Sequence, residues 1–199
     1  MRVVGVISLL LLCAGCASTT QTVDLDHDVE ITVSVDAKDI DEAAAEFSDS
    51  LLVAPRLGGT EETPAVLALG RVTNDTCQHL DVDVLLTKIA QVLIASDRFE
   101  VSSVFAARAD QRDQMVTDAR LVRGNAEFEA ATVQRRGTLH APTLSLSGKI
   151  VQRNVRRDNG GTRIEYFFTL KVTRISDGVV LWQKSRQIVK AVAKGMPLW

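Results

Sequence analysis

The chain has 199 residues and three cysteines, which predicts one domain with short additional segments and excludes a disulfide-rich framework. The formal net charge of −2 conceals an uneven division, because residues 17–50 hold ten of the 25 acids and a single lysine. Beyond residue 50, 15 acids face 21 lysine and arginine residues, so an acidic beginning precedes a basic body. This division indicates either a body that meets an acidic surface or a solvated face without a partner.

The amino terminus has the three parts of a secretory signal. Arg2 precedes the apolar run Val3–Leu12, and small residues then lead to Cys16. The run is too short to cross a bilayer as a stable helix. Its ending, Cys13-Ala14-Gly15-Cys16, resembles a bacterial lipobox in which Cys13 stands where leucine is usual. The resemblance implies that residues 1–15 are removed and that Cys16 carries the lipid, with plain secretion as the alternative.

Lipidation of Cys16 has two further consequences for the expected mature protein. Ala17, rather than aspartate, follows the lipidated residue and resembles the sorting signal for the outer membrane of a Gram-negative cell. Several acyl chains on one residue anchor durably, because each buried CH₂ contributes about 0.8 kcal/mol. Cys77 is then the one free thiol, so no intramolecular disulfide is expected and the fold must be held by its core.

Residues 16–35 are predicted to form an acidic flexible tether. Ser, Thr, Gln and Asp dominate this stretch, and only Val29–Val35 alternates in hydrophobicity as an edge strand would. Flexible behaviour gives a segment of this length a root-mean-square reach of roughly 20–25 Å. The remaining chain, residues 36–199, is predicted to be a single globular domain.

The domain is expected to start with a helix over Asp39–Ala54. Its apolar residues recur on one face, Asp36 or Asp39 can cap the start, and Pro55 ends it. A glycine-containing loop follows this helix. The continuously apolar run Val66–Leu69 then indicates a strand that is buried on both faces.

Between this strand and the next helix, polar residues are packed more densely than a plain turn needs. The helix is indicated by apolar residues that recur every three or four positions: Val82, Leu86, Ile89 and Leu93. Gly70–Asp83 is therefore predicted to contain a strand-to-helix loop, where a rigid scaffold displays binding side chains. The same residue types also close turns and cap helices by bonding backbone N–H groups. The residues concerned are Arg71, Asn74, Thr76, His79, Asp81 and Asp83.

Shorter elements are expected in the middle of the chain. Arg98–Val101 is predicted to be a short strand, and Ser103–Met115 is predicted to be a helix capped by a serine at its start. A glycine and an asparagine then break that helix. Ala126–Gln134 is predicted to add one or two further helical turns.

The last third of the chain predicts strands. Thr143–Arg153 has its apolar residues on one face, and residues 164–173 alternate between apolar and polar side chains. Turn signals at Asp158–Gly161 and Ser176–Gly178 separate these strands from Val179–Val189. We therefore expect an α/β fold with a mixed sheet, helices on one face of it and a three-stranded antiparallel meander at the carboxyl end.

Known catalytic and metal-binding patterns are absent from the sequence. His27, His79 and His140 have no further ligand at helical or turn spacing, and no phosphate-binding glycine loop or hydrolase motif occurs. Cys77 is interpreted as a loop thiol, because no third group orients His79 two residues away. We therefore predict a protein that is not an enzyme and that holds no metal or cofactor.

Basic residues gather in the sequence around the predicted hairpin: Arg135, Arg136, Lys149, Arg153, Arg156, Arg157 and Arg163. Export argues against nucleic acid as the target of this cluster. An acidic protein patch or an anionic glycan strand would fit, because arginine binds carboxylates through two parallel hydrogen bonds. A solvated rim without a partner is the alternative. From this cluster, Arg153, Arg156 and Arg157 are the candidate protein-binding residues.

Two blocks of sequence resemble the LpoB family, the lipoprotein activators of penicillin-binding proteins. The first block is Arg71-Val72-x-Asn74-x-Thr76, then His79-x-Asp81-x-Asp83 and a helix; the second is Gly178-Val179-Val180-Leu181-Trp182, then Ile188-Val189-Lys190. The resemblance covers roughly residues 36–192 and implies a fold like the amino-terminal domain of TolB. The long Pro-rich linker of the best-known LpoB proteins has no counterpart in this chain.

The resemblance also implies a function and a location. It implies a monomer on the periplasmic face of the outer membrane that binds a class A penicillin-binding protein, a bifunctional synthase. The protein would stimulate glycan polymerisation and cross-linking, without nucleic acid or a cofactor. An outer-membrane assembly or secretion lipoprotein similar to the CsgG type is the alternative, and it would form a ring-shaped oligomer.

Overall fold

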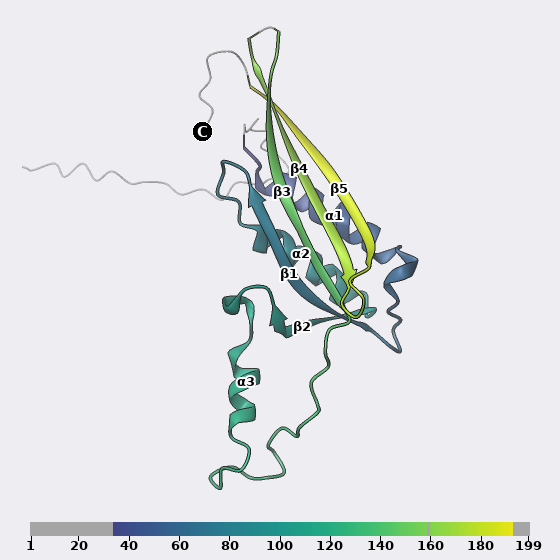
Figure 1. Cartoon of the computed structure of the whole chain (residues 1–199), viewed down its shortest axis with the longest axis vertical. Coiled ribbons are helices and arrows are strands. Elements are labelled where there is room, and N and C mark those ends of the chain that lie inside the picture. Colours follow the sequence, from purple (N-terminus) through teal and green to yellow (C-terminus); the bar gives the residue numbers. More distant parts are fainter. Residues whose placement is uncertain (1–33, 159, 193–199) are drawn as a thin grey trace, which may run out of the picture. The chain divides into compact units, whose positions relative to one another are not determined.

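The computed structural model describes residues 34–158 and 160–192, so Cys16, the expected signal and nearly all of the expected tether lie outside the described residues. Within these ranges the chain forms three α-helices and a five-stranded sheet (Figure 1). The helices are α1 (Ala37–Leu52), α2 (Val82–Ala95) and α3 (Gln114–Leu121), with short 3-10 helices at Pro55–Leu57 and Ala109–Gln111. The strands are β1 (Ala65–Asp75), β2 (Phe99–Ala106), β3 (Leu144–Arg156), β4 (Thr162–Arg174) and β5 (Val180–Val192).

The sheet is mixed, as predicted, and its strands lie in the order β2-β1-β3-β4-β5. β1 runs parallel to both of its neighbours, β2 and β3. β3, β4 and β5 form an antiparallel meander, which confirms the prediction for the last third of the chain. The turn between β3 and β4 closes where predicted, since the Arg157 amide donates to the Gly161 carbonyl at 2.9 Å.

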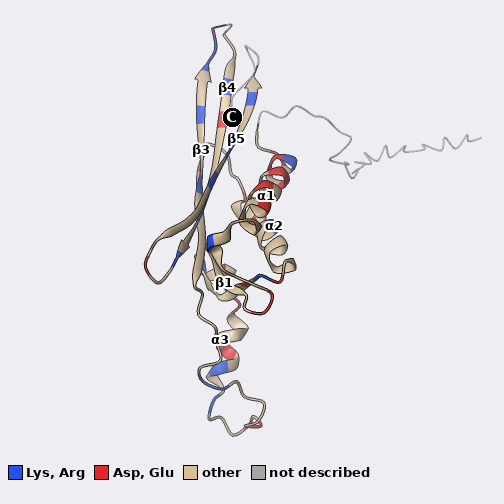
Figure 2. Ribbon diagram, turned by 90° about the vertical axis from the view of Figure 1, so that its right-hand side faces the viewer, with Lys and Arg blue, Asp and Glu red and all other residues tan. Residues whose placement is uncertain are grey.

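α1 and α2 lie on the same face of the sheet, as predicted, and two directions of view show this arrangement (Figure 1, Figure 2). Phe47 on α1, Ile89 on α2 and Tyr166 on β4 have 0% of their surface exposed in the core between these layers. Along β4, every second residue from Ile164 to Val172 faces this core, because side chains alternate between the two faces of a strand. The opposite face of the sheet, which neither α1 nor α2 covers, is the open face.

β1 is longer than predicted, so the loop expected within Gly70–Asp83 is shorter than the sequence indicates. The strand continues to Asp75 because its backbone pairs with β3 over most of its length. The register shifts between Leu69 and Val72, which is a β-bulge that inserts one residue. Pairing with a distant strand overrides the turn preference of the polar residues, and only residues 76–81 connect β1 to α2.

The predicted helix over Ser103–Met115 is wrong except for its last two residues, Gln114 and Met115. Residues up to Ala106 continue β2, which pairs with β1. The Ser102 hydroxyl accepts two backbone amides of the same strand at 3.4 and 3.3 Å and does not cap a helix. The helix begins only at Gln114, where the Asp113 carboxylate is the N-cap.

The segment between α3 and β3 also differs from the prediction. Ala126–Gln134 forms turns, not helical turns. Gly124 adopts a positive φ of 84° just after α3, which confirms the predicted break. α3 has no buried residue, so little apolar packing favours further helix here. In the described part of the chain, no helix combines the length and hydropathy that a membrane span requires.

α1 begins two residues before the predicted start at Asp39, and of the two predicted caps, Asp36 and Asp39, the N-cap is Asp36. The Asp36 carboxylate accepts the Asp39 amide at 3.0 Å, and the Asp39 carboxylate accepts the Asp36 amide at 3.1 Å. These reciprocal bonds form a capping box, which satisfies two amides that have no partner within the helix.

Four acids of α1 and its cap are paired with cations of β5, and a further acid, Asp41, binds Lys88 of α2 at 2.7 Å. The pairs are Arg186–Glu42 at 2.6 Å, Arg186–Glu46 at 2.8 Å, Lys184–Glu46 at 2.9 Å, Lys190–Asp36 at 3.3 Å and Lys190–Asp39 at 2.6 Å. The Lys184 ammonium, together with Arg186, lowers the pKa of Glu46. The acidic beginning seen in the sequence therefore has two parts, because the acids from Asp36 onward belong to the domain, where four of them bind its last strand.

Candidate protein-binding surface

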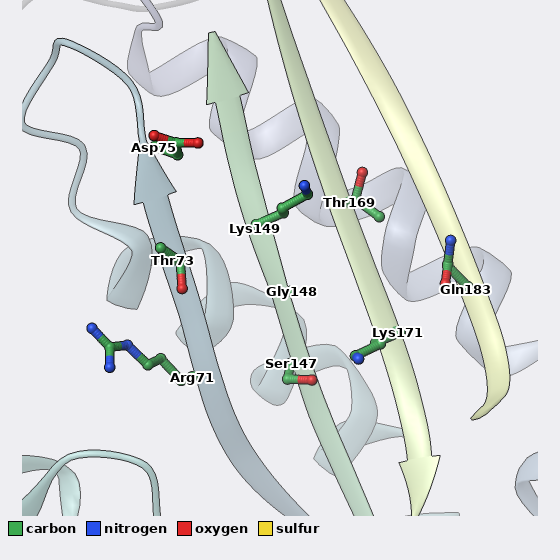
Figure 3. Close-up of a pocket in the computed structure, with 9 residues that line it drawn as sticks. All are labelled: Arg71, Thr73, Asp75, Ser147, Gly148, Lys149, Thr169, Lys171 and Gln183. Carbon is green, nitrogen blue, oxygen red and sulfur yellow. The ribbon is translucent and has the colours of Figure 1, made fainter. Parts of the chain in front are cut away.

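The open face of the sheet carries a groove of about 530 Å³ (Figure 3). Its charged lining residues are Arg71 and Asp75 from β1, Lys149 from β3 and Lys171 from β4. The other lining residues are small or polar: Thr73, Ser147, Gly148, Thr169 and Gln183. The groove therefore presents three cations, one carboxylate, hydroxyls and an amide from four neighbouring strands.

Positive charge on the open face is largely unpaired. One cation, Arg163, binds Glu165 at 2.7 Å. Within residues 34–158 and 160–192, the other cations of this face make no ion pair; they are Arg71, Lys149, Arg153 and Lys171. All four of these side chains are exposed. They are thus available to bind carboxylates of another molecule or segment.

The bulge in β1 places Arg71 on the open face. Leu67 and Leu69 face the helices, so plain alternation would turn Arg71 and Thr73 toward the helices as well. The inserted residue reverses the alternation, and Val72 becomes the buried one at 7% exposure. Gly70 permits the bulge, because a Cβ there would lie 2.7 Å from the Leu146 carbonyl oxygen.

Asn74 and Thr76 close the turn that follows β1. The Asn74 side-chain amide donates to the Gln78 carbonyl at 2.7 Å. The Thr76 hydroxyl donates to Asn74 Oδ1 at 2.8 Å and lies 3.1 Å from the Gln78 amide, from which it accepts. These are the local side-chain to backbone bonds that stabilise turns. The structure thus gives both side chains the turn-closing role that the sequence left open.

Gln78, which the sequence did not single out, ties this turn to two distant parts of the domain. Its amide nitrogen donates to the Tyr166 hydroxyl at 2.7 Å, and its amide oxygen accepts the Val35 amide at 3.3 Å. Burial raises the pKa of the Tyr166 hydroxyl above its ordinary value. No local pattern announces these contacts, because Val35 and Tyr166 are 43 and 88 residues away from Gln78.

The remaining predicted residues of this block lie at the start of α2. His79 is exposed in the connection. Asp81 is the N-cap of α2 and accepts the Asp83 amide at 3.1 Å. The Asp83 carboxylate accepts bonds from Arg108 at 3.2 Å and Gln111 at 2.7 Å, which holds the segment after β2 against α2. The structure therefore gives Asp81 a capping role and Asp83 a tertiary packing role.

The candidate arginines of the hairpin lie beyond the groove and do not share one face. Arg153 is on the open face, alternation places Arg156 on the opposite side of β3, and Arg157 is in the turn. All three are exposed. Arg135 and Arg136 belong to the segment after α3, so the cluster near the hairpin is smaller than the sequence indicates.

The described residues form a surface that is suited to binding. Among them, no group of His, Cys, Asp and Glu could hold a metal ion. The exposed Cys77 thiol donates to Gln152 Oε1 at 3.0 Å, in the loop where it was expected. The cations of the groove can bind carboxylates, and its hydroxyl and amide groups can bond the backbone of an extended acidic segment.

Replacing Asn74 by alanine should destabilise the domain without removing a contact to a protein partner. The substitution removes a partly buried side chain that both donates and accepts a hydrogen bond, which costs about 1–2 kcal/mol of unfolding free energy. Urea unfolding measures this loss, with Asp75→Ala as a neighbour that should stay within about 0.5 kcal/mol of the native value. A variant of native stability that binds its partner weakly would instead make Asn74 a contact residue.

One family model and several solved structures are similar to this chain. The family model described as peptidoglycan-synthase activator LpoB matches residues 39–188. No curated protein matches the chain. Among solved structures, the LpoB C-terminal domain from Escherichia coli is 13% identical with a TM-score of 0.43, over 75% of this chain and 98% of that chain. The PelC dodecamer from Paraburkholderia phytofirmans is 16% identical with a TM-score of 0.32, over 64% of this chain and 72% of that chain.

Proposed function

Because the chain belongs to the LpoB family of peptidoglycan-synthase activators, we propose that it is a lipid-anchored periplasmic protein that binds and stimulates a class A penicillin-binding protein. Members of this family are activators, not enzymes. A protein of this kind raises the activity of a synthase by binding its active conformation more tightly than its inactive one. The stimulated reactions are glycan polymerisation and cross-linking.

The family match is the observation that carries this proposal. The matched residues, 39–188, include α2 and β1 to β4 entirely and most of α1 and β5. The whole sheet scaffold, and not one short motif, thus resembles the activators. Function still depends on a particular surface of the scaffold, and the open face is the surface that we consider for contact with the synthase.

We assign the contact with the synthase to the open face, with an acidic surface of the synthase as its counterpart. The groove supplies Arg71, Lys149 and Lys171, and Arg153 continues the basic surface toward the hairpin. Unpaired cations on a rigid sheet are a favourable arrangement for binding carboxylates, because neither side has to break an existing ion pair. Arg156 and Arg157 flank this surface at the end of the hairpin.

Cys16 supplies the lipid anchor in this proposal, on the periplasmic face of the outer membrane. The segment 16–35 then gives a reach of roughly 20–25 Å, which keeps the domain near the anchoring membrane. The synthase therefore has to extend its contact surface toward the outer membrane. Activators with a long linker have a different geometry, because their linker itself covers the distance from the outer membrane to the synthase.

A purified synthase provides the test. The mature chain (residues 16–199) with Cys16→Ser in place of the lipid should run as a monomer in size exclusion and bind a class A penicillin-binding protein. It should also increase the rate at which that enzyme polymerises a lipid-linked glycan precursor, by several-fold at saturation. If the protein neither binds nor accelerates any class A synthase of the same cell, the proposal that it is an activator is refuted. A ring-shaped oligomer would favour an assembly lipoprotein.

A further inference from the structure

The two edge strands of the sheet, β2 and β5, differ in how their backbone groups are used. In β2, the Ser102 hydroxyl accepts two amides of its own strand, and the Asp113 amide donates to the Ser103 carbonyl at 2.9 Å. At the other edge, β5 pairs with β4 on one side, and no further strand of the described chain pairs with its outer side (Figure 1). An unpaired edge offers its N–H and C=O groups to an additional strand. β5 is therefore the edge that can accept one.

The backbone bonds at the turn between β4 and β5 show which residues of β5 point outward. The Arg174 amide donates to the Val179 carbonyl at 2.9 Å. The following amide, of Ile175, donates to the Thr143 carbonyl on the side of β3, also at 2.9 Å. Because the direction of bonding alternates along a strand, even-numbered residues of β4 bond β5 and odd-numbered ones bond β3. Even-numbered residues of β4 pair with even-numbered residues of β5 over 182–192, so the outward residues of β5 are the odd-numbered ones: Gln183, Ser185, Gln187, Val189 and Ala191.

These outward residues carry none of the features that protect a sheet edge. Proteins protect edges with charged side chains, proline, bulges or short strands. All five outward residues are exposed and uncharged, β5 has 13 residues without a proline, and its register shift lies before them. The cations of β5, Lys184, Arg186 and Lys190, alternate with them and bind acids of α1 and its cap. The edge is thus suited to pairing with an extended segment of another molecule.

The groove on the open face reaches this edge and indicates which side chains such a segment carries. Gln183 lines the groove and pairs with Lys171 of β4. A strand added to β5 would lie about 4.8 Å beyond it and would turn every second side chain toward the open face. Acidic side chains at these positions would approach Lys171 and Lys149, which make no ion pair within the described residues (Figure 3). On the helix side the cations of β5 are already paired, so uncharged side chains fit there.

We propose that the synthase adds an extended segment to the outer edge of β5, with acidic side chains toward the groove and uncharged ones toward α1. The outward residues supply main-chain hydrogen bonds, and the cations of the groove select acidic side chains at alternate positions. The identity of the partner rests on the proposed function, whereas the unpaired edge belongs to the domain itself.

A second copy of the chain fits this edge less well than an acidic segment. Antiparallel pairing of two β5 strands centred on Arg186 would place Arg186 opposite Arg186 of the other copy. Pairing centred on Gln187 would place Lys184 opposite Lys190. Like charges directly opposite each other in a sheet are destabilising.

Hydrogen exchange of the outward amides tests the proposal. In the free mature chain with Cys16→Ser, the amides of Gln183, Ser185 and Gln187 should exchange rapidly, because unbonded exposed amides have little protection. In the complex with a class A penicillin-binding protein, exchange at these amides should slow by roughly tenfold or more, while the exposed amides of Glu61 and Glu62 stay fast. Protection of the outward amides in the free chain would overturn the proposal, since the chain itself or a second copy would then occupy the edge.

Two substitutions at one outward position separate backbone from side-chain contacts. Gln187→Pro removes an amide that does not bond β4, which an edge strand tolerates, and its ring blocks an added strand. This variant should bind the synthase roughly 10- to 100-fold more weakly, because hydrogen bonds of the added segment are lost. Gln187→Ala keeps the backbone and should bind within about threefold of the native protein.

The outcomes distinguish this proposal from the proposed function. If no class A synthase binds the native chain, the proposed function fails and this proposal fails with it. If the synthase binds the native chain but leaves the outward amides unprotected, or binds Gln187→Pro with native affinity, only the proposal for the edge is wrong. Where Gln187→Pro does not fold, hydrogen exchange in the native complex decides alone.

Discussion

Reversing three charges in the groove, with Arg71→Glu, Lys149→Glu and Lys171→Glu together, should weaken binding of the synthase by roughly 100- to 1000-fold. All three side chains are exposed and make no ion pair within the described residues, so the fold does not depend on them. Like charges brought together at an interface cost several kcal/mol, and each 1.4 kcal/mol is a tenfold loss of affinity. Titration calorimetry at physiological salt measures the loss.

The matched control for this variant places the same change of charge elsewhere. Lys38→Glu, Arg56→Glu and Arg136→Glu alter three exposed cations that lie outside the groove. This triple variant should bind the synthase within about threefold of the native protein, because distant charges are screened beyond about 8 Å at physiological salt. If both triple variants weaken binding equally, net charge and not the open face attracts the synthase, and the assignment of the surface is wrong.

Replacing Phe47 by alanine should cost about 3–5 kcal/mol of unfolding free energy. Phe47 has 0% of its surface exposed, and its ring meets the Trp182 ring edge-on, with centroids 6.3 Å apart and an interplanar angle of 82°. The substitution leaves a cavity between α1 and the sheet that the neighbouring side chains fill only in part. The free energy of unfolding of a native domain is about 5–15 kcal/mol in total, so this single change removes a large share of the stability.

Urea unfolding with linear extrapolation measures this loss, and Val53→Ala is the control. Val53 lies at the C-cap of the same helix and is 79% exposed, so its truncation should stay within about 0.5 kcal/mol of the native value. A loss below about 1 kcal/mol for Phe47→Ala would mean that α1 does not pack on the sheet as described. Where the variant remains folded, its affinity for the synthase should be native, because Phe47 lies on the face opposite the groove.

Local signals in the sequence were sufficient for several elements. Asp36 or Asp39 was expected to cap the first helix, and Asp36 does so through a reciprocal pair of bonds with Asp39. Alternation along β4 and the turn signals on either side of it predicted the meander, which the strand pairing confirms. These features depend on residues within a few positions of one another, where hydrogen bonding and side-chain periodicity act directly.

Where polar residues can serve two purposes, local signals were insufficient. Asn74 suits a loop as well as the end of a strand, and only pairing with β3 makes it a strand residue. The serines at 102 and 103 suit a helix cap as well as a strand, and pairing with β1 decides for the strand. In both cases the deciding partner is distant in the chain, so no short window contains the information.

The amino-acid order by itself determined the two helices that cover the sheet, the alternating strands and the turns between them, since each depends on near neighbours. Only the tertiary structure decided which side chains share a surface. Arg71, Lys149 and Lys171 come from three strands that pairing sets side by side, and one inserted residue in β1 turns Arg71 toward the open face. Gln78 likewise meets Val35 and Tyr166 only in the folded chain. The physical reason is that strand pairing joins residues far apart in sequence, and a shift of one residue exchanges the two faces of a strand.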